Sequence, residues 1–197
     1  MLNDYHFCDI IIKGMIHSSW KGNVPVKLVV PTMEFEKEIQ AFRQEFIVNG
    51  GDMDGCLSLR KMENIADWIK LVEDCSKAET CPSKWVPQTQ FIYVREEDNK
   101  VIGVIQIRHY FNEYLEKYAG HIGYSVCHSE RRKGYATGML RDVLPECAKL
   151  GINKVLICCR DNTDGSRKTI LNNGGIYEST VYEPNDKVYL ERYWITL

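Results

Sequence analysis

The chain has 197 residues, of which 25 are Lys or Arg and 27 are Asp or Glu, so its formal net charge is −2. Hydrophobic residues make up 44% and charged residues 26% of the sequence, which is typical of one globular domain with a sizeable core. This balance gives no support to a general nucleic-acid partner or to a membrane-surface role, because both favour basic chains. No basic start followed by a long apolar run is present, so we expect neither a signal peptide nor a membrane-spanning helix.

Eight cysteines are spread along the chain with no CxxC pair and no regular spacing. Zinc ribbons and thioredoxin-type sites require such spacing, so we expect no metal, reduced thiols and a cytoplasmic location. Residues 1–25 hold histidines, a cysteine and aspartates whose spacing matches no metal-binding pattern. We interpret residues 1–25 as an N-terminal arm of unclear role, an extra strand or packing segment, and residues 26–197 as the domain.

The first half of the chain predicts a strand, two helices and a hairpin. Residues 26–30 are apolar and β-branched and end at a proline, as a strand does. Apolar residues at helical spacing follow Thr32, a residue that can cap a helix, and stop at two glycines. A second helix surrounds Trp68, and a loop with two prolines follows it. The next predicted elements are strands at 90–95 and 101–110, joined by a turn, and a short helical or irregular segment at 112–118.

The second half predicts strands and helices in alternation. A strand over residues 121–126 precedes a helix from 135 to 150, and Pro145 is expected to kink or shorten that helix. Residues 154–159 predict a buried strand that follows its helix as a crossover unit does. The remaining elements are a turn at 162–166, a helix at 167–173 and a hairpin of strands 176–182 and 188–195. This order predicts an α/β fold with a mixed, mostly antiparallel sheet and one parallel crossover.

The chain is organised around residues 121–136, which read HIGYSVCHSERRKGYA. A helix that begins directly after a strand directs unpaired backbone N–H groups and the positive end of its dipole at whatever lies beyond the strand. Gly134 and Ala136 allow close approach, and the basic residues before them add positive charge. The segment therefore predicts a ligand that carries phosphate. No GxxxxGK[ST] or GxGxxG run is present, so the P-loop and dinucleotide motifs are absent.

Arg131, Gly134 and Ala136 form the pattern Arg-x-x-Gly-x-Ala, which resembles the pyrophosphate-binding signature of the GNAT superfamily of N-acetyltransferases. The order of elements over residues 26–197 is similar to the same fold, and SERRKGYAT and ILNNGGIYE resemble a bacterial branch of predicted acetyltransferases. The resemblance implies a GNAT-like mixed, mostly antiparallel central sheet with splayed parallel strands and flanking helices. It also implies acetyl-CoA as the donor substrate, an amine acceptor, no metal, and a cofactor site made of Val126, Cys127, His128, Arg131, Arg132, Lys133, Gly134, Tyr135, Ala136, Thr137, Asn162 and Ser166.

Three residues are candidates for the acid and base steps of amine acetylation. His121 and Glu113 are candidate bases, and His121 is preferred because its ordinary pKa of about 6.5 suits the task. A structural histidine bonded to backbone is the alternative. The resemblance implies an acid near the sulfur, but Leu171 stands where many family members have a tyrosine. Ser166 resembles the serine of an Asn-x-x-Ser turn, although Asn162 precedes it by four residues, and Ser166 could equally be a helix cap.

Two alternatives to the acetyltransferase remain open. A non-catalytic acyl-CoA-binding regulatory module would keep the cofactor turn and lose the acid, and a thiol-dependent enzyme would use Cys127, Cys158 or Cys159. The acceptor, a small molecule or a protein amine, cannot be identified from the pattern. A group of acidic residues would suit a cationic acceptor, although a charged face of a surface helix is their commoner meaning; these residues are Glu34, Glu36, Glu38, Asp52 and Asp54. The exposed edge of the final hairpin is compatible with a homodimer.

Overall fold

The computed structural model describes residues 16–17 and 24–197. Within these residues no helix is both long and apolar enough to cross a membrane. The short strand β1 (Ile16–His17) pairs with the next strand, so this part of the N-terminal arm extends a sheet as expected. The other polar residues singled out in the arm lie outside the described residues.

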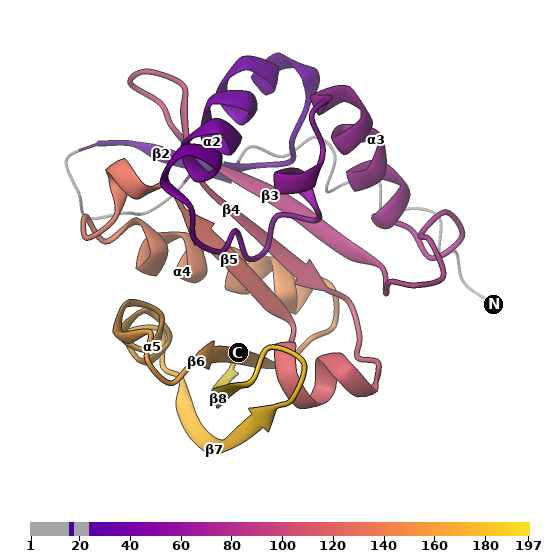
Figure 1. The fold of residues 1–197 in the computed structure, drawn as a ribbon, viewed down its shortest axis with the longest axis vertical. Coiled ribbons are helices and arrows are strands. Elements are labelled where there is room, and N and C mark those ends of the chain that lie inside the picture. The colour runs from indigo at the N-terminus through magenta and orange to yellow at the C-terminus, as the bar shows by residue number, and fades with distance from the viewer. Residues whose placement is uncertain (1–15, 18–23) are drawn as a thin grey trace.

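The larger of two sheets holds five strands in the order β1-β2-β3-β4-β5, and every neighbouring pair is antiparallel (Figure 1). The predicted hairpin is confirmed, although its first strand begins two residues earlier than expected. β5 is the last strand of this sheet, so one of its edges pairs with β4 and the other is open. The strands after β1 are β2 (Val26–Val29), β3 (Gln88–Arg95), β4 (Lys100–Arg108) and β5 (Ile122–Val126).

Helices cover both faces of this sheet (Figure 1). Because side chains alternate along a strand, Ile92 and Val94 of β3 join one core cluster and Phe91 and Tyr93 join the other. The first cluster includes α2 and α3, and the second includes α4. These helices are α2 (Glu36–Asn49), α3 (Ile65–Cys75) and α4 (Tyr135–Lys149), with short helical segments η1 (Met33–Phe35), η2 (Leu59–Lys61), η3 (Leu115–Ala119) and η4 (His128–Glu130).

The smaller sheet has three antiparallel strands in the order β6-β8-β7. β5 and β6 therefore belong to different sheets, and the expected parallel pair forms no ladder. Just before β5, an isolated bridge joins Gly120 to Ile157 of β6. Beyond this bridge β5 and β6 form no ladder within the described residues, and we call the interval between their edges the gap. The elements of this half are β6 (Lys154–Arg160), α5 (Asp164–Leu171), β7 (Ile176–Glu183) and β8 (Val188–Thr196). The predicted α/β fold with antiparallel sheets and flanking helices is confirmed.

Three local predictions need correction. Thr32 precedes a short 3-10 turn, η1, and its side chain makes no capping bond. Pro145 does not shorten α4, because the helix continues to Lys149. Val143 and Cys147 on either side of the proline are fully buried, and tertiary packing outweighs the lost backbone bond. The predicted turn at 162–166 is shorter than expected, since α5 already begins at Asp164.

Candidate active site

The turn between β5 and α4 has the geometry of an anion site. Gly134 is the N-cap of α4, with φ 88° and ψ 0°, a left-handed conformation that favours glycine. No side chain caps the helix at this end. The backbone N–H groups of the first turn, from Tyr135 to Thr137, therefore have no capping side chain in front of them. A phosphate group could accept hydrogen bonds there and would lie at the positive end of the helix dipole.

The three basic residues of the turn are engaged differently. The guanidinium of Arg131 donates from Nε to the carbonyl oxygen of Val126 at 3.1 Å and lies 5.7 Å from the ring centroid of Phe46. Lys133 donates to Glu130 Oε2 at 2.8 Å. Arg132 is exposed, with φ 66°, and its side chain makes no hydrogen bond or ion pair within residues 24–197. Arg132 is thus the side chain of this run that is most available to a ligand.

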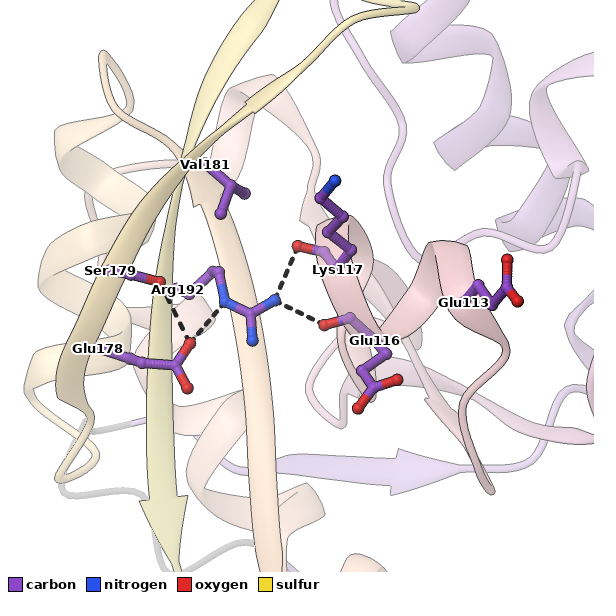
Figure 2. A pocket seen from close by; sticks show the side chains of 7 residues that line it. All are labelled: Glu113, Glu116, Lys117, Glu178, Ser179, Val181 and Arg192. Carbon is purple, nitrogen blue, oxygen red and sulfur yellow. Dashed lines mark hydrogen bonds and ion pairs between the residues drawn. The ribbon is translucent and has the colours of Figure 1, made fainter.

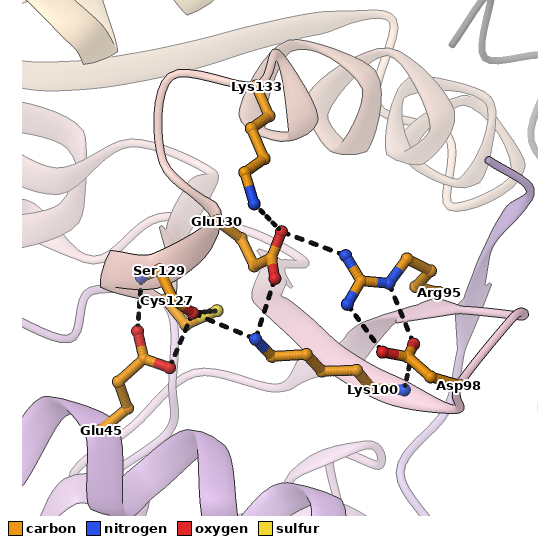
Figure 3. Close-up of polar contacts among 8 residues, drawn as sticks. All are labelled: Glu45, Arg95, Asp98, Lys100, Cys127, Ser129, Glu130 and Lys133. Carbon is orange, nitrogen blue, oxygen red and sulfur yellow. Dashed lines mark hydrogen bonds and ion pairs between the residues drawn. The ribbon is translucent and has the colours of Figure 1, made fainter. Parts of the chain in front are cut away.

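Glu130 is the centre of a charged cluster beneath the turn (Figure 3). Its carboxylate is 4% exposed and contacts Arg95 at 3.1 Å, Lys100 at 2.8 Å and Lys133 at 2.8 Å. Burial alone would raise the pKa of Glu130, but hydrogen bonds from the two lysines and the nearby positive charges lower it to about 2. Since these cations come from β3, β4 and the turn itself, the cluster fixes the turn to the sheet.

Backbone groups of β5 that have no strand partner within the described residues face the gap. The Arg108 N–H donates to the carbonyl of His121, and the Cys127 N–H donates to the carbonyl of Ile102. The backbone N–H and C=O groups of the odd-numbered residues of β5 therefore point towards β4. By the alternation of a strand, the N–H and C=O groups of Ile122, Tyr124 and Val126 face the open edge. Of these groups, the Val126 carbonyl is held by Arg131. An extended ligand could pair with this edge as another strand would.

A loop of residues 52–58 packs on one face of β5. Gly55, at φ 69°, packs against the backbone of Gly123 so closely that a Cβ there would overlap the Gly123 carbonyl. The Ser125 hydroxyl donates to the carbonyl of Asp54 at 2.7 Å, and Gln90 Nε2 donates to the carbonyl of Gly55 at 2.9 Å. These bonds hold the Asp54 residue over the middle of β5.

Acidic side chains of this loop therefore lie near the gap. The Asp54 side chain is solvent-accessible, yet the surrounding protein raises the pKa of its carboxyl by desolvation, and the charge of Asp52 raises it further. Arg160, at the end of β6, bonds Asp52 at 2.9 Å and lies 4.0 Å from Asp186 of the β7–β8 turn. From the sequence, Asp54 was only one of several acidic candidates, because the residues that position it are distant in the chain.

His121 lies at the seam between the two sheets. Its ring Nδ1 accepts a hydrogen bond from the backbone N–H of Leu156 at 3.0 Å, and the backbone N–H of His121 donates to the Leu156 carbonyl at 2.8 Å. The residue is 7% exposed, and its ring lies 4.0 Å from that of Phe111. Burial, with the nearby charge of Arg108, lowers the pKa of His121 to about 4. This geometry favours the structural histidine over the base, because the Nδ1 lone pair is occupied.

Glu113 lies on a pocket of about 450 Å³ between η3 and β7 (Figure 2). Arg192 crosses the pocket, donating to Glu178 at 2.5 Å and to the carbonyls of Glu116 and Lys117 at 2.6 and 2.7 Å. Arg192 thus ties η3 to β7. No residue of β5 lines this pocket. Glu113 is exposed and has no side-chain bond within the described chain, so its geometry gives it no advantage as a base.

Ser166 lies inside the first turn of α5 and is not a helix cap, since the N-cap is Thr163. Its hydroxyl oxygen is 2.7 Å from the phenol oxygen of Tyr124. Asn162 precedes the helix and is exposed, and Leu171, at the position of the family tyrosine, is 47% exposed. The contact between Tyr124 and Ser166 was not predicted from the sequence. The available signal was the alternation along β5, which puts the backbone groups of Tyr124 on the open edge of the strand.

The cysteines near the gap are poor nucleophiles. Burial raises the pKa of Cys127 and Cys159 to about 11 and that of Cys158 to about 12. Thiols with such values stay protonated near neutral pH, so the geometry opposes the thiol-dependent alternative. The seven cysteines of the described residues are all free, as expected for reduced thiols.

Comparisons with known proteins agree with this architecture. The family model described as "Acetyltransferase (GNAT) family" matches residues 59–171, which is more than half of the chain. No relative is found among curated protein sequences. A solved structure of the microcin C7 self-immunity acetyltransferase MccE, in complex with acetyl-CoA and AMP, has a TM-score of 0.63 and 16% identity and covers 89% of this chain and 94% of its own.

Two further similar structures are ribosomal-protein acetyltransferases. One, from Salmonella typhimurium, modifies the N-terminal serine of ribosomal subunit protein L7/L12; its TM-score is 0.64 at 16% identity, with 93% of this chain and 99% of its own covered. The other is the ribosomal-protein-S5-alanine acetyltransferase of Vibrio fischeri, with a TM-score of 0.66 at 11% identity, covering 92% and 96%. At such identities the likeness shows the fold alone.

The fold, the turn and the family match together define an acetyltransferase. The chain belongs to the acetyltransferase (GNAT) family, and the predicted donor of that family, acetyl-CoA, is thereby confirmed. The residues present suit this donor, since an uncapped helix N-terminus follows directly on an open strand edge. The individual residues predicted to contact it remain predictions.

Proposed function

We propose that this protein is an N-acetyltransferase that moves an acetyl group from acetyl-CoA to a primary amine by direct attack. The observation that carries the proposal is the continuity between the open edge of β5 and the uncapped N-terminus of α4. A ligand with an extended amide arm and a pyrophosphate needs these two features in this order. Acetyl-CoA has that shape and supplies, when bound, an acetyl group on a thioester.

The donor site of this proposal consists mainly of backbone. The first turn of α4 from Gly134 to Thr137 binds the pyrophosphate, with Arg132 as the available cation. Arg131 supports the strand end by holding the Val126 carbonyl, and Lys133 is directed to Glu130 instead of the ligand. The amide arm pairs with the open edge around Val126, and we assign Asn162 and the segment from Cys127 to His128 to the same donor site.

The transfer forms a bond between the amine nitrogen and the thioester carbon and breaks the carbon–sulfur bond. The products are an amide, the CoA thiol and one proton released from the ammonium form of the acceptor. Negative charge develops on the carbonyl oxygen during attack, and we assign its stabilisation to the Tyr124 N–H, which strand alternation directs to the open edge. We assign deprotonation of the acceptor to Asp54, since His121 Nδ1 is occupied and Glu113 lies on another pocket.

The acceptor is a primary amine, and the first class to test is the N-terminus of a peptide. One structure of the same fold is named for modifying the N-terminal serine of a ribosomal protein, and another is named as a ribosomal-protein-S5-alanine acetyltransferase. The acidic residues around Arg160 suit a cationic acceptor such as spermidine, which makes a second class.

The first experiment is a calorimetric titration of the purified protein with acetyl-CoA and, separately, with ATP and NAD. We expect acetyl-CoA alone to bind. Acetylation is then measured by mass spectrometry with spermidine and with peptides that begin with a free serine or alanine. Mass spectrometry is preferred because thiol-reactive dyes would also label the partly exposed Cys81 and Cys158. No binding of acetyl-CoA would overturn the proposal.

One observation favours a second candidate, a non-catalytic acyl-CoA-binding module. Leu171 stands in place of the family tyrosine and is half exposed, so α5 offers no phenol of its own to the leaving sulfur. Such a module would bind acetyl-CoA as tightly as an enzyme but give no product with any amine of the panel.

A further inference from the structure

We propose that Tyr124 is a positioning residue that orients the Ser166 hydroxyl to donate a hydrogen bond to the sulfur leaving acetyl-CoA. The inference rests on the proposed function. In this arrangement Tyr124 of β5 contributes a phenol group, whereas α5 has Leu171 at the position of the family tyrosine.

The two hydroxyls meet across the gap between the sheets. Tyr124 is the central residue of β5, and its backbone faces the open edge. Its side chain reaches α5, where the phenol oxygen lies 2.7 Å from Ser166 Oγ and 3.4 Å from the Ser166 carbonyl. This contact joins the larger sheet to the helix that follows β6, at the place where the strands themselves form no ladder. A ligand arm paired with the open edge of β5 would therefore run beside this pair.

The direction of the hydrogen bond follows from acidity. A phenol is a stronger acid than an alcohol, so Tyr124 donates and Ser166 Oγ accepts. The Cys159 thiol lies within hydrogen-bonding reach of the Ser166 hydroxyl and is a neighbour to which the remaining proton can point. A protonated thiol is a weak acceptor, so this contact leaves the Ser166 O–H able to turn to a stronger acceptor such as a thiolate. Burial raises the pKa of Tyr124, which keeps the phenol a neutral donor. A donor that is itself hydrogen-bonded in this way is polarised and donates more strongly.

The role in the transfer is that of a hydrogen-bond donor. When the carbon–sulfur bond breaks, its electron pair moves to sulfur, and the Ser166 O–H donates to the resulting thiolate. The proton that completes the thiol comes from the attacking nitrogen, which must lose it to become an amide. The hydroxyl pair therefore keeps its protons over a full turnover, and no further reactant is needed.

The kinetic test compares Tyr124→Phe, Ser166→Ala and the double variant. Each single change should lower kcat about 10- to 50-fold, as expected for a lost hydrogen bond to a charged group, with the KM for acetyl-CoA within about twofold. The double variant should lose no more than the worse single variant, because both changes break one chain of bonds. Tyr177→Phe is the matched control, since this exposed phenol bonds the Thr180 hydroxyl at 3.0 Å and should leave kcat unchanged.

A second measurement needs no acceptor. Calorimetric affinities for CoA and acetyl-CoA are compared at pH 7.5 and 9.5, on either side of the thiol pKa. The wild type should gain several-fold in CoA affinity at high pH, and Tyr124→Phe and Ser166→Ala should lose that gain. Acetyl-CoA has no thiol, so its affinities correct for the titratable and charged groups around the pair. These groups are Asp54, Cys159, Asp161, Arg167 and Glu191.

The outcomes separate the two proposals. Wild-type turnover with an unchanged Tyr124→Phe rate, or additive losses in the double variant, would overturn the positioning role and leave the enzyme intact. Absence of turnover in the wild type would overturn the proposed function, while the pH-dependent CoA affinity would still decide the role of Tyr124. Equal thermal unfolding of the variants is required in both measurements, and a gain in CoA affinity that survives in both variants would contradict the inference.

Discussion

The two sides of the gap are built differently. On the donor side, the turn after β5 is fixed by the buried Glu130 cluster and by Glu45 of α2, whose carboxylate accepts from the Ser129 N–H at 2.6 Å (Figure 3). On the acceptor side, the pairs of Arg160 with Asp52 and Asp186 are exposed, at 41%, 58% and 64% of their side chains. Exposed ion pairs contribute little to stability, so the acceptor side can change its charges at small cost. This difference indicates that the donor side is built to keep one arrangement, whereas the charged residues of the acceptor side can be exchanged to suit different acceptors.

The strongest test of the donor side is Gly134→Leu. A side chain here would block the approach of phosphate to the first turn of α4, and the loss of two charge-assisted bonds should weaken acetyl-CoA binding about 1,000-fold by calorimetry. The matched control is Gly151→Leu at the other end of α4, which is also left-handed, at φ 77°, with nothing within 4 Å of its added Cβ. The control should show the same backbone strain and normal binding. Equal binding by the two variants would show that the turn is not the phosphate site.

On the acceptor side, Asp54→Asn should lower kcat about 100-fold, the lower range for loss of a positioned base. Acetyl-CoA affinity should stay within about twofold, because the donor turn is untouched. The carboxyl pKa is raised by burial and Asp52, so the acid limb of the pH–rate profile should lie above the ordinary value of 3.8. The variant should lack this limb. An unchanged profile would remove Asp54 from the chemistry.

Glu130→Gln should destabilise the fold by about 2 kcal/mol, less than for a fully buried pair because Lys100 and Lys133 are partly exposed. The pKa of Glu130 in the folded state, about 2, lies below its ordinary value of 4.5. Its stabilising effect is thus complete above about pH 4.5 and is lost as the pH falls towards 2. Urea unfolding at pH 7 and pH 3 measures both effects, and a variant as stable as wild type at pH 7 would show that the cluster does not hold the turn.

The smallest effect is expected for Asp52→Asn, which breaks the exposed pair with Arg160. The free energy of unfolding should fall by less than about 0.5 kcal/mol in the same urea experiment. A loss as large as that of Glu130→Gln would contradict the contrast between the two sides.

The sequence predicted the strand, turn and helix of the donor side because the signals for these elements are local. Gly134 is needed for a left-handed N-cap, and the strand before it and the helix after it have clear periodicities, so a short window holds the whole turn. The same window could not show that Lys133 is directed to Glu130, because the competing cations Arg95 and Lys100 come from the hairpin.

The rest of the site depends on contacts between distant segments. Asp54 reaches β5 through Gly55 and Ser125, and Tyr124 reaches Ser166 across 42 positions of the chain. No periodicity encodes such pairs. His121 was preferred as a base because of its ordinary pKa. In the folded chain burial lowers this pKa and the Leu156 backbone occupies Nδ1, and only folding brings these groups together. Pro145 was expected to disturb α4 because propensity weighs a residue alone, whereas its neighbours are held by the core.

The strand order of the smaller sheet has a consequence for synthesis. β8 lies between β6 and β7, and within the described chain each of these strands pairs only with β8. A nascent chain that has emerged only as far as the β7–β8 turn therefore carries two strands without partners, one of them the apolar run from Val155 to Cys159. The larger sheet has all its strands before residue 127 and can form first. For the time that the ribosome takes to add β8, the apolar β6 is the segment most in need of protection from other chains.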